Sequence, residues 1–214
     1  MDLMIIGTGK MAEAIATRAL SGGHNVTISG RNKTKADELS SSLSSAAAKG
    51  ATVKSAPFGG QITGDVVVLA VPYSAAIPIV RDLSTTISGK ILVDITNPLN
   101  SSYNGLVTPP DSSAAEEIAK VIPSGTKIVK AFNTVFAGTI KKGEVGGQPL
   151  DVFIAGDDSD AKNMIRRLIE SGKMRPIDAG PLQRSRELEA LAFLIISLQS
   201  TMGTNFMSAV KILS

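Results

Sequence analysis

The sequence predicts an α/β fold built on a doubly wound parallel sheet, with a small C-terminal α/β and helical extension. Two observations support this prediction. Short apolar runs such as Asp65–Pro72 alternate with stretches of helical periodicity, which is the pattern of repeated β-α-β units. In addition, the first apolar run breaks at a glycine and continues directly as a helix. Connections between parallel strands are right-handed, so this alternation predicts helices on both faces of the sheet.

The first twelve residues predict a strand, a tight turn and the start of a helix. Leu3–Ile6 is apolar throughout, as expected for a strand buried on both faces. Gly7, Gly9 and Ala12 match the G-x-G-x-x-G/A spacing of Rossmann-type dinucleotide-binding folds. Gly7 permits the turn, Gly9 lets the backbone approach a pyrophosphate, and Ala12 allows close packing of helix on strand. A dinucleotide site at the N-terminus of this helix is therefore predicted.

The second strand is predicted over Asn25–Ile28, with a helix from about Thr34. Sites for NAD usually place a carboxylate about 20 residues beyond the glycines, to bind the ribose hydroxyls. This chain has none there and carries instead Ser29, Gly30, Arg31, Asn32, Lys33 and Lys35. A guanidinium fork with nearby ammonium groups suits a dianionic 2′-phosphate, which favours NADP over NAD. The alternative is a solvated basic helix start, which the helix dipole disfavours unless an anion is present.

Further strands are predicted over Ala51–Ser55, Asp65–Pro72 and Lys90–Ile95, with a helix containing Ala75–Leu83. Ligands in such sheets lie outside the carboxyl ends of the strands. The residues that we therefore expect to line the cofactor crevice are Ala70, Val71, Pro72, Tyr73 and Asn97. Asn97–Asp111, which is rich in Pro, Gly, Ser and Asn, is predicted to be a surface loop.

The second half of the chain continues with a helix over Ser112–Val121 and a strand over Lys127–Ala131. Strands over Asp151–Ala155 and Arg175–Asp178 flank a helix that ends near Glu170. The aspartates at positions 157, 158 and 160 are interpreted as helix caps rather than metal ligands, and no metal site is predicted. We expect a dinucleotide-binding domain over residues 1–135, and a smaller C-terminal part over residues 136–214 that is packed with it as one unit.

The last helix is predicted from Arg184 to about Met202. It is apolar on most faces but too short to span a membrane, so we expect it to be buried within the domain or between two subunits of a homodimer.

Composition limits the functional classes. The chain is 43% hydrophobic and 19% charged, as in folded globular proteins, and no apolar run approaches the ~20 residues of a membrane span. It has no cysteine, which excludes disulfides, thiol nucleophiles and thiolate metal sites. The 22 Lys and Arg against 19 Asp and Glu are dispersed, so nucleic acid is not an expected partner. Because Asp2 lies in a start without a basic region, no signal peptide is predicted, and the expected location is the cytoplasm.

Five blocks of this sequence carry a resemblance to a known family: Ile5–Gly9, Val68–Pro72, Val129–Thr134, Val152–Asp158 and Pro176–Leu182. Together they resemble the NADP:coenzyme F420 oxidoreductase family, the deazaflavin-dependent NADP reductases. They are also similar to the NADPH-binding domain of the six-transmembrane metalloreductases. The resemblance implies NADP(H) as cofactor and a flavin or deazaflavin as co-substrate.

The resemblance also implies roles for individual positions. Thr8, Gly9, Lys10 and Met11 correspond to the residues around the pyrophosphate, and Gly30, Arg31 and Lys35 to the 2′-phosphate pocket. The wall beside the adenosine and ribose corresponds to Ala70, Val71 and Pro72, and the segment at the nicotinamide to Asn133 and Ala137. The chain departs from the deazaflavin enzymes at Asn133, where they have histidine, and at Tyr73, where a larger indole is usual.

Hydride transfer between a nicotinamide and a flavin-like ring requires two stacked faces and no obligatory acid or base. We therefore predict no catalytic side chain. The only histidine, His24, is expected at the edge of the sheet away from the crevice. The acceptor cleft is expected to be roofed by the Asn97–Asp111 loop, the Phe132–Ala137 segment and the Gly180-Pro181-Leu182 turn.

Two alternatives remain. A small keto or imine reductase of the β-hydroxyacid dehydrogenase type needs a proton donor. The candidates are Tyr73, Tyr103, Lys130 and Asp178. Against this alternative, such enzymes place a lysine on a long C-terminal helical domain, whereas the only lysine in the final region is Lys211. The other alternative is a non-catalytic NADP-binding redox sensor.

Overall fold

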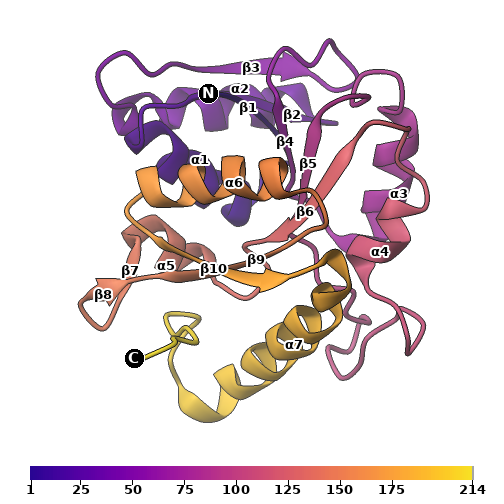
Figure 1. Cartoon of the computed structure of the whole chain (residues 1–214). Coiled ribbons are helices and arrows are strands. Elements are labelled where there is room, and N and C mark those ends of the chain that lie inside the picture. The colour runs from indigo at the N-terminus through magenta and orange to yellow at the C-terminus, as the bar shows by residue number, and fades with distance from the viewer. Residues whose placement is uncertain (214) are drawn as a thin grey trace.

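The computed structural model describes residues 1–213, which contain an eight-stranded sheet with helices on both faces (Figure 1). The strand order is β10-β9-β6-β5-β4-β1-β2-β3. The six mutually parallel strands are β1 (Asp2–Ile6), β2 (Asn25–Gly30), β3 (Val53–Pro57), β4 (Val66–Leu69), β5 (Ile91–Asp94) and β6 (Lys127–Ala131). The chain builds the sheet outward from β1 through β2 to β3, then crosses to the other side of β1 and continues outward through β4, β5 and β6. This is the doubly wound order, so the predicted Rossmann-like sheet is confirmed.

The C-terminal extension departs from the parallel arrangement. β9 (Asp151–Ala155) pairs antiparallel with β6, and β10 (Arg175–Gly180) runs parallel to β9. The connection from β6 to β9 contains a short helix, α5 (Ala137–Lys142), and a hairpin of β7 (Glu144–Val145) and β8 (Gln148–Pro149), none of which was predicted. The chain returns to the sheet in the opposite direction, so the last two residues of β9 pair with the last two residues of β6.

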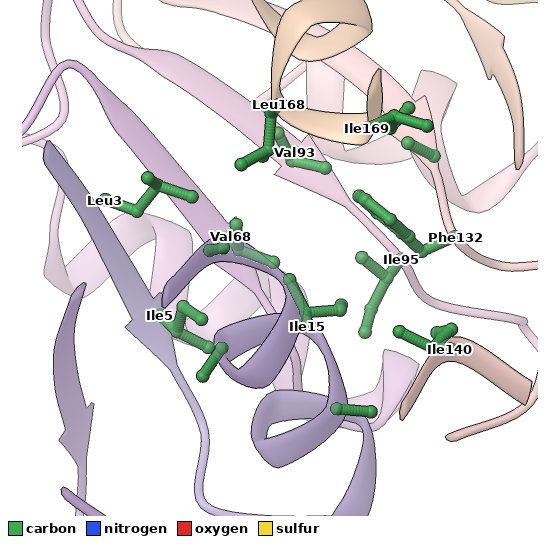
Figure 2. Packing of buried hydrophobic residues seen from close by; sticks show 14 of the residues in the cluster. Leu3, Ile5, Ile15, Val68, Val93, Ile95, Phe132, Ile140, Leu168 and Ile169 are labelled. Carbon is green, nitrogen blue, oxygen red and sulfur yellow. The ribbon is translucent and has the colours of Figure 1, made fainter. Parts of the chain in front are cut away.

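One face of the sheet is covered by α1 (Lys10–Ser21), α2 (Lys33–Ser42), α5 and α6 (Ser159–Ser171). Figure 2 shows Ile15 of α1 and Leu168 of α6 packed near the strand side chains Val68 and Val93. Each aliphatic side chain buried in this way contributes roughly 1.5–3 kcal/mol. This single cluster runs from Leu3 to Met174, so residues on both sides of position 135 share one core.

The opposite face is covered by α3 (Tyr73–Asp82) and α4 (Ala114–Ala119). The last helix, α7 (Ser185–Met202), continues this layer, because its Leu188 packs against Phe153 and Ala155 of β9. Its other side exposes Leu194, Leu198 and Met202. The expected burial of this helix within the domain therefore applies to one face only.

Of the three aspartates interpreted as helix caps, Asp158 is the N-cap of α6 and Asp160 lies in its first turn. The Asp158 carboxylate accepts a hydrogen bond from the Ala161 amide at 2.9 Å and pairs with Lys127. Asp157 accepts from the Leu182 amide at 2.8 Å. Both carboxylates are thus engaged in protein contacts.

The helices within residues 1–213 include none with the length and apolar character required to span a bilayer.

Candidate active site

The turn after β1 brings three strand ends together. Gly7 has φ +133°, and a Cβ atom there would lie 2.1 Å from the Ala70 carbonyl oxygen. Its amide donates to the Ser29 carbonyl at 2.8 Å, so the turn is held between the ends of β4 and β2. Gly9 differs, because a Cβ atom there meets nothing within 4 Å. No side chain caps α1, so its first-turn amides face open space beside Gly9.

A cavity of about 340 Å³ lies beyond this turn, at the end of β2. Its wall combines the glycine turn with two basic residues and residues that follow β4: Ile6, Gly7, Thr8, Gly9, Gly30, Arg31, Asn32, Lys35, Phe58, Ala70, Val71, Pro72, Ala75 and Ile79. No carboxylate is among them, so the charges of Arg31 and Lys35 are not neutralised within the cavity wall. The Asn32 oxygen caps α2 by accepting from the Lys35 amide at 3.0 Å.

Ser29 is the one predicted site residue that lines neither this cavity nor the three hollows that continue from it. Strand β2 extends to Gly30, two residues beyond the predicted end, and Ser29 is therefore inside the sheet. It is 1% exposed, and its hydroxyl donates to the Pro57 carbonyl of β3. Its contribution to the turn is the carbonyl that holds the Gly7 amide.

Three further hollows continue from this cavity along the strand ends. A hollow of about 320 Å³ joins it at Gly9 and is lined by Lys10, Met11, Ala70, Val71, Pro72, Tyr73, Ile95, Thr96 and Asn97. Next is an apolar hollow of about 710 Å³, which shares Met11 and Asn97. The last, of about 530 Å³, contains Lys10, Ala137 and Gly138 and meets the apolar hollow at Phe136. The hollows share lining residues and form one groove, which collects every other predicted cofactor residue.

Two asparagines form the floor of the apolar hollow. Asn133 Nδ2 donates to Asn97 Oδ1 at 3.0 Å, and Asn97 Nδ2 donates to the Asn133 carbonyl at 2.8 Å. The preceding residue, Phe132, has φ +61° and is 1% exposed, so its buried ring supports the left-handed backbone that turns the chain here. Asn133 Oδ1 is buried and has no hydrogen-bond partner among residues 1–213. A buried acceptor without a partner costs about 1–3 kcal/mol, so this atom suits a ligand N–H group.

The end of α7 and the loop after it form the opposite wall: Ile196, Gln199, Ser200, Asn205 and Phe206. Gln199 holds the loop, because its Oε1 accepts from Thr204 Oγ1 at 2.6 Å and from the Phe206 amide at 3.0 Å. The Phe206 ring packs edge-to-face on Phe136, with centroids 5.1 Å apart. The sequence patterns did not identify this wall. The only signal was Gly203 at the end of the predicted helix.

Two of the three segments expected to roof the acceptor cleft line the groove. Tyr103 of the Asn97–Asp111 loop and the Phe132–Ala137 segment line the groove. The Gly180-Pro181-Leu182 turn lines none of the four hollows, and its assignment to the cleft was wrong. Because β10 runs against β6, this turn lies toward the start of β6, where Leu182 belongs to the same buried cluster as Ile128.

The candidate proton donors occupy different environments. Lys130 is fully buried and binds Asp94 and Glu189. Burial alone lowers the pKa of Lys130, but these two carboxylates outweigh it and raise the pKa. Asp178 pairs with Lys162 at 3.0 Å and accepts from the Gly180 amide.

The two tyrosines and the histidine differ in their relation to the groove. Tyr73 lines it, and its pKa is raised by burial and by nearby carboxylates. Tyr103 is 65% exposed. His24 lies at the start of β2, between the Met1 amine and the Ser171 hydroxyl, and is not among the residues of the four hollows.

Within residues 1–213, no group of three His, Cys, Asp or Glu side chains is arranged to hold a metal ion.

Comparison with known proteins agrees with this geometry. Residues 2–98 match the family described as NADP oxidoreductase coenzyme F420-dependent. The F420-dependent NADP reductase of Methanothermobacter marburgensis is 30% identical over 204 residues, covering 90% of this chain and 89% of that protein. The chain belongs to the F420-dependent NADP reductase family. The resemblance stated from the sequence is thereby confirmed.

Other relatives extend this family assignment. The crystal structure of a putative F420-dependent NADP reductase from Arthrobacter sp. FB24 covers 99% of both chains, with a TM-score of 0.83 and 29% identity. Metalloreductase STEAP3 of Rattus norvegicus is 30% identical over 195 residues, which are 90% of this chain but 36% of that protein. The similarity to metalloreductases therefore concerns one part of a longer protein.

Proposed function

We propose that this protein is an oxidoreductase that transfers hydride between NADP(H) and a flavin or deazaflavin ring bound in the apolar hollow. The names of its family relatives support the reaction class. In the functional division that we propose, residues 1–135 bind the adenosine and pyrophosphate end of the cofactor, and residues 136–214 complete the acceptor side.

The groove fits NADP(H) at three points. Space for a pyrophosphate lies beside Gly9 and the uncapped first turn of α1. Arg31 and Lys35 provide positive charge for a 2′-phosphate in a cavity without a carboxylate. Asn133 Oδ1 offers a buried acceptor for the N–H of a carboxamide or of a flavin-type ring.

The lining of the apolar hollow is the observation that carries the proposal. Its residues include no carboxylate, lysine, arginine or histidine, and its one titratable group is the exposed Tyr103 phenol. Carbonyl or imine reduction requires a positioned proton donor, whereas hydride transfer to a flavin-type ring does not. Lys130 cannot take that part, because its ammonium protons are directed at Asp94, Glu189 and the Thr96 carbonyl.

The mechanism requires the chain to bind, orient and exclude water. NADPH supplies a hydride when bound. The α1 amides and Arg31 fix the phosphates, and the Asn97–Asn133 pair fixes the floor. Phe136 and Phe206 present aromatic surface against which a planar ring can stack. The apolar walls keep water away from the reacting faces.

The decisive experiment is anaerobic NADPH oxidation with deazaflavin, FMN, FAD, ferric chelates, quinones and small carbonyls as acceptors. We expect turnover with flavin-type rings and not with carbonyls. Turnover with carbonyls alone contradicts the proposal and favours the keto or imine reductase. Tight NADPH binding without turnover of any acceptor favours the redox sensor.

We further propose that the protein is a cytoplasmic homodimer formed through the exposed side of α7. Leu194, Leu198 and Met202 recur every four residues on that side and are 55%, 39% and 56% exposed. Such a stripe on one helix face is typical of an interface between copies. Sedimentation at micromolar concentration tests this proposal, because a monomer at that concentration contradicts it.

A further inference from the structure

We propose that Glu189 of α7 and Lys130 of β6 are a pair of positioning residues that hold the acceptor wall at a fixed place over the cofactor groove. The acceptor wall is the end of α7 and the loop after it, residues 196–206, which line the apolar hollow. The inference rests on the function proposed above. Neither side chain lines the groove. Their action is through the backbone and the helix that they hold.

Lys130 fixes the floor of the groove. Its Nζ lies 2.7 Å from Asp94 Oδ2, 2.6 Å from Glu189 Oε1 and 2.6 Å from the Thr96 carbonyl oxygen. Asp94 Oδ1 in turn accepts from the Thr96 amide at 2.9 Å. Both peptide groups of Thr96 are therefore held, and the residue that follows is Asn97, a partner in the asparagine floor.

Glu189 connects that floor to two helices. Besides Lys130, its carboxylate accepts from the Ala114 amide at 2.9 Å and from the Ala115 amide at 3.4 Å, in the first turn of α4. Burial raises the pKa of Glu189, while Lys130 and the Ala114 amide favour its charged form. The neighbouring Leu188 carbonyl accepts from Asn133 Nδ2 at 3.0 Å. Two successive residues of α7 thus bind the sheet edge directly below the groove.

The distance along α7 makes this anchor matter for the reaction. Gln199, which holds the loop after α7, is ten residues beyond Glu189, or roughly 15 Å along the helix axis. A tilt of roughly 5° at the anchor moves that end by roughly 1.3 Å over such a length. Displacements of about 1 Å in a reacting geometry reduce rates by about a hundredfold. Small changes at Glu189 are therefore amplified at the acceptor wall.

A purely stabilising role does not account for this arrangement. Buried ion pairs contribute little net stability compared with apolar side chains of similar size. A second link already ties α7 to α4, since Arg186 binds Glu116 through Nε at 2.8 Å and Nη2 at 2.6 Å. That pair lies near the surface and touches no residue of the floor. It provides a matched control within the same helix pair.

The test compares Glu189→Gln with Arg186→Gln. Glutamine keeps the size of the side chain but cannot accept from both Lys130 and the Ala114 amide. We expect Glu189→Gln to raise the KM for FMN and lower kcat by about tenfold each, which together match the roughly hundredfold loss expected for a displacement of about 1 Å. The Kd for NADPH, measured by fluorescence, should change less than twofold. Arg186→Gln should leave all three values within twofold of the wild type.

A second readout is hydrogen exchange of the amides at positions 195–207, which should become faster in Glu189→Gln and not in Arg186→Gln. If Glu189→Gln does not fold, Glu189→Asp retains the charge but shortens the reach, and is expected to show the same pattern more weakly. A KM for FMN and an exchange pattern equal to the wild type overturn the proposal, as does an equal effect of both variants. Absence of wild-type turnover with every acceptor refutes the proposed function alone, and exchange then decides the positioning role.

Discussion

Replacement of Arg31 by alanine is the sharpest test of the cofactor assignment. Arg31 is exposed and lines the cavity at the end of β2 together with Lys35, with no carboxylate in the cavity wall. If the 2′-phosphate binds here, Arg31→Ala removes a charge-assisted hydrogen bond that NADH cannot make. NADPH binding should weaken, and NADH binding should hardly change.

The magnitude follows from the geometry of this end of the groove. Hydrogen bonds to charged groups contribute about 1.5–3 kcal/mol, and solvent exposure places this one near the middle of that range, at about 2 kcal/mol. A loss of about 2 kcal/mol raises the Kd for NADPH by about thirtyfold. Lys35 remains in place, so binding is not abolished.

Fluorescence titration of both nucleotides at two ionic strengths measures this effect. Lys33→Ala is the matched control, since Lys33 is two residues away but pairs with Asp37 at 2.7 Å and does not line the cavity. The control should leave both affinities within twofold, and higher salt should narrow the difference between wild type and Arg31→Ala. Equal losses for NADPH and NADH in Arg31→Ala would refute the 2′-phosphate assignment.

Four further substitutions probe the turn, the C-terminal tail and the acid candidate. Gly7→Ala should lower the melting temperature strongly, because Gly7 has φ +133° and a Cβ atom there would lie 2.1 Å from the Ala70 carbonyl oxygen. Gly9→Ala should keep the melting temperature but weaken NADPH binding, because a Cβ atom at Gly9 extends into open space. Equal melting temperatures of the two variants contradict this reasoning. For Asp151, burial raises the pKa, but Arg175, the Ile212 amide and Lys211 outweigh it and lower the pKa from 3.8 to about 2. Asp151 therefore adds roughly 2 kcal/mol to the free energy of unfolding above pH 4, and this contribution is lost as the pH falls toward 2. In urea unfolding, Asp151→Asn should be less stable than the wild type at pH 7. If the variant is still less stable by the same amount at pH 2, the difference does not come from ionisation of this carboxyl group. Tyr73→Phe should keep its kcat with flavin acceptors, and a tenfold loss would make the Tyr73 hydroxyl part of the chemistry.

Local sequence patterns predicted those parts of the molecule whose structure depends on neighbours in the chain. The apolar run before Gly7 is typical of a buried strand and the repeat after it of a helix, and both form here. The carboxyl ends of parallel strands lie at one edge of the sheet. For this reason the positions of Gly9, Arg31, Ala70 and Asn133 along one groove could be anticipated. Each lies just beyond the carboxyl end of one of the parallel strands, and these ends meet at one edge of the sheet.

Contacts between distant segments account for the errors. An apolar strand such as β9 has the same pattern in either direction, so its reversal beside β6, and with it the displacement of the Gly180-Pro181-Leu182 turn, could not be anticipated. Ser29 was expected to follow the end of β2, but the pairing of β2 with β3 continues two residues beyond the apolar run and includes Ser29.

The sequence by itself determined the Rossmann-like sheet, the glycine turn and the basic residues after β2, because these follow from local periodicity and spacing. Only the tertiary structure decided what faces the cofactor groove. The end of α7 arrives there because Glu189 and Leu188 bind Lys130 and Asn133, residues that lie 59 and 55 positions away. Such pairings depend on how helices pack on the sheet, and no local pattern encodes which buried charge will meet which partner.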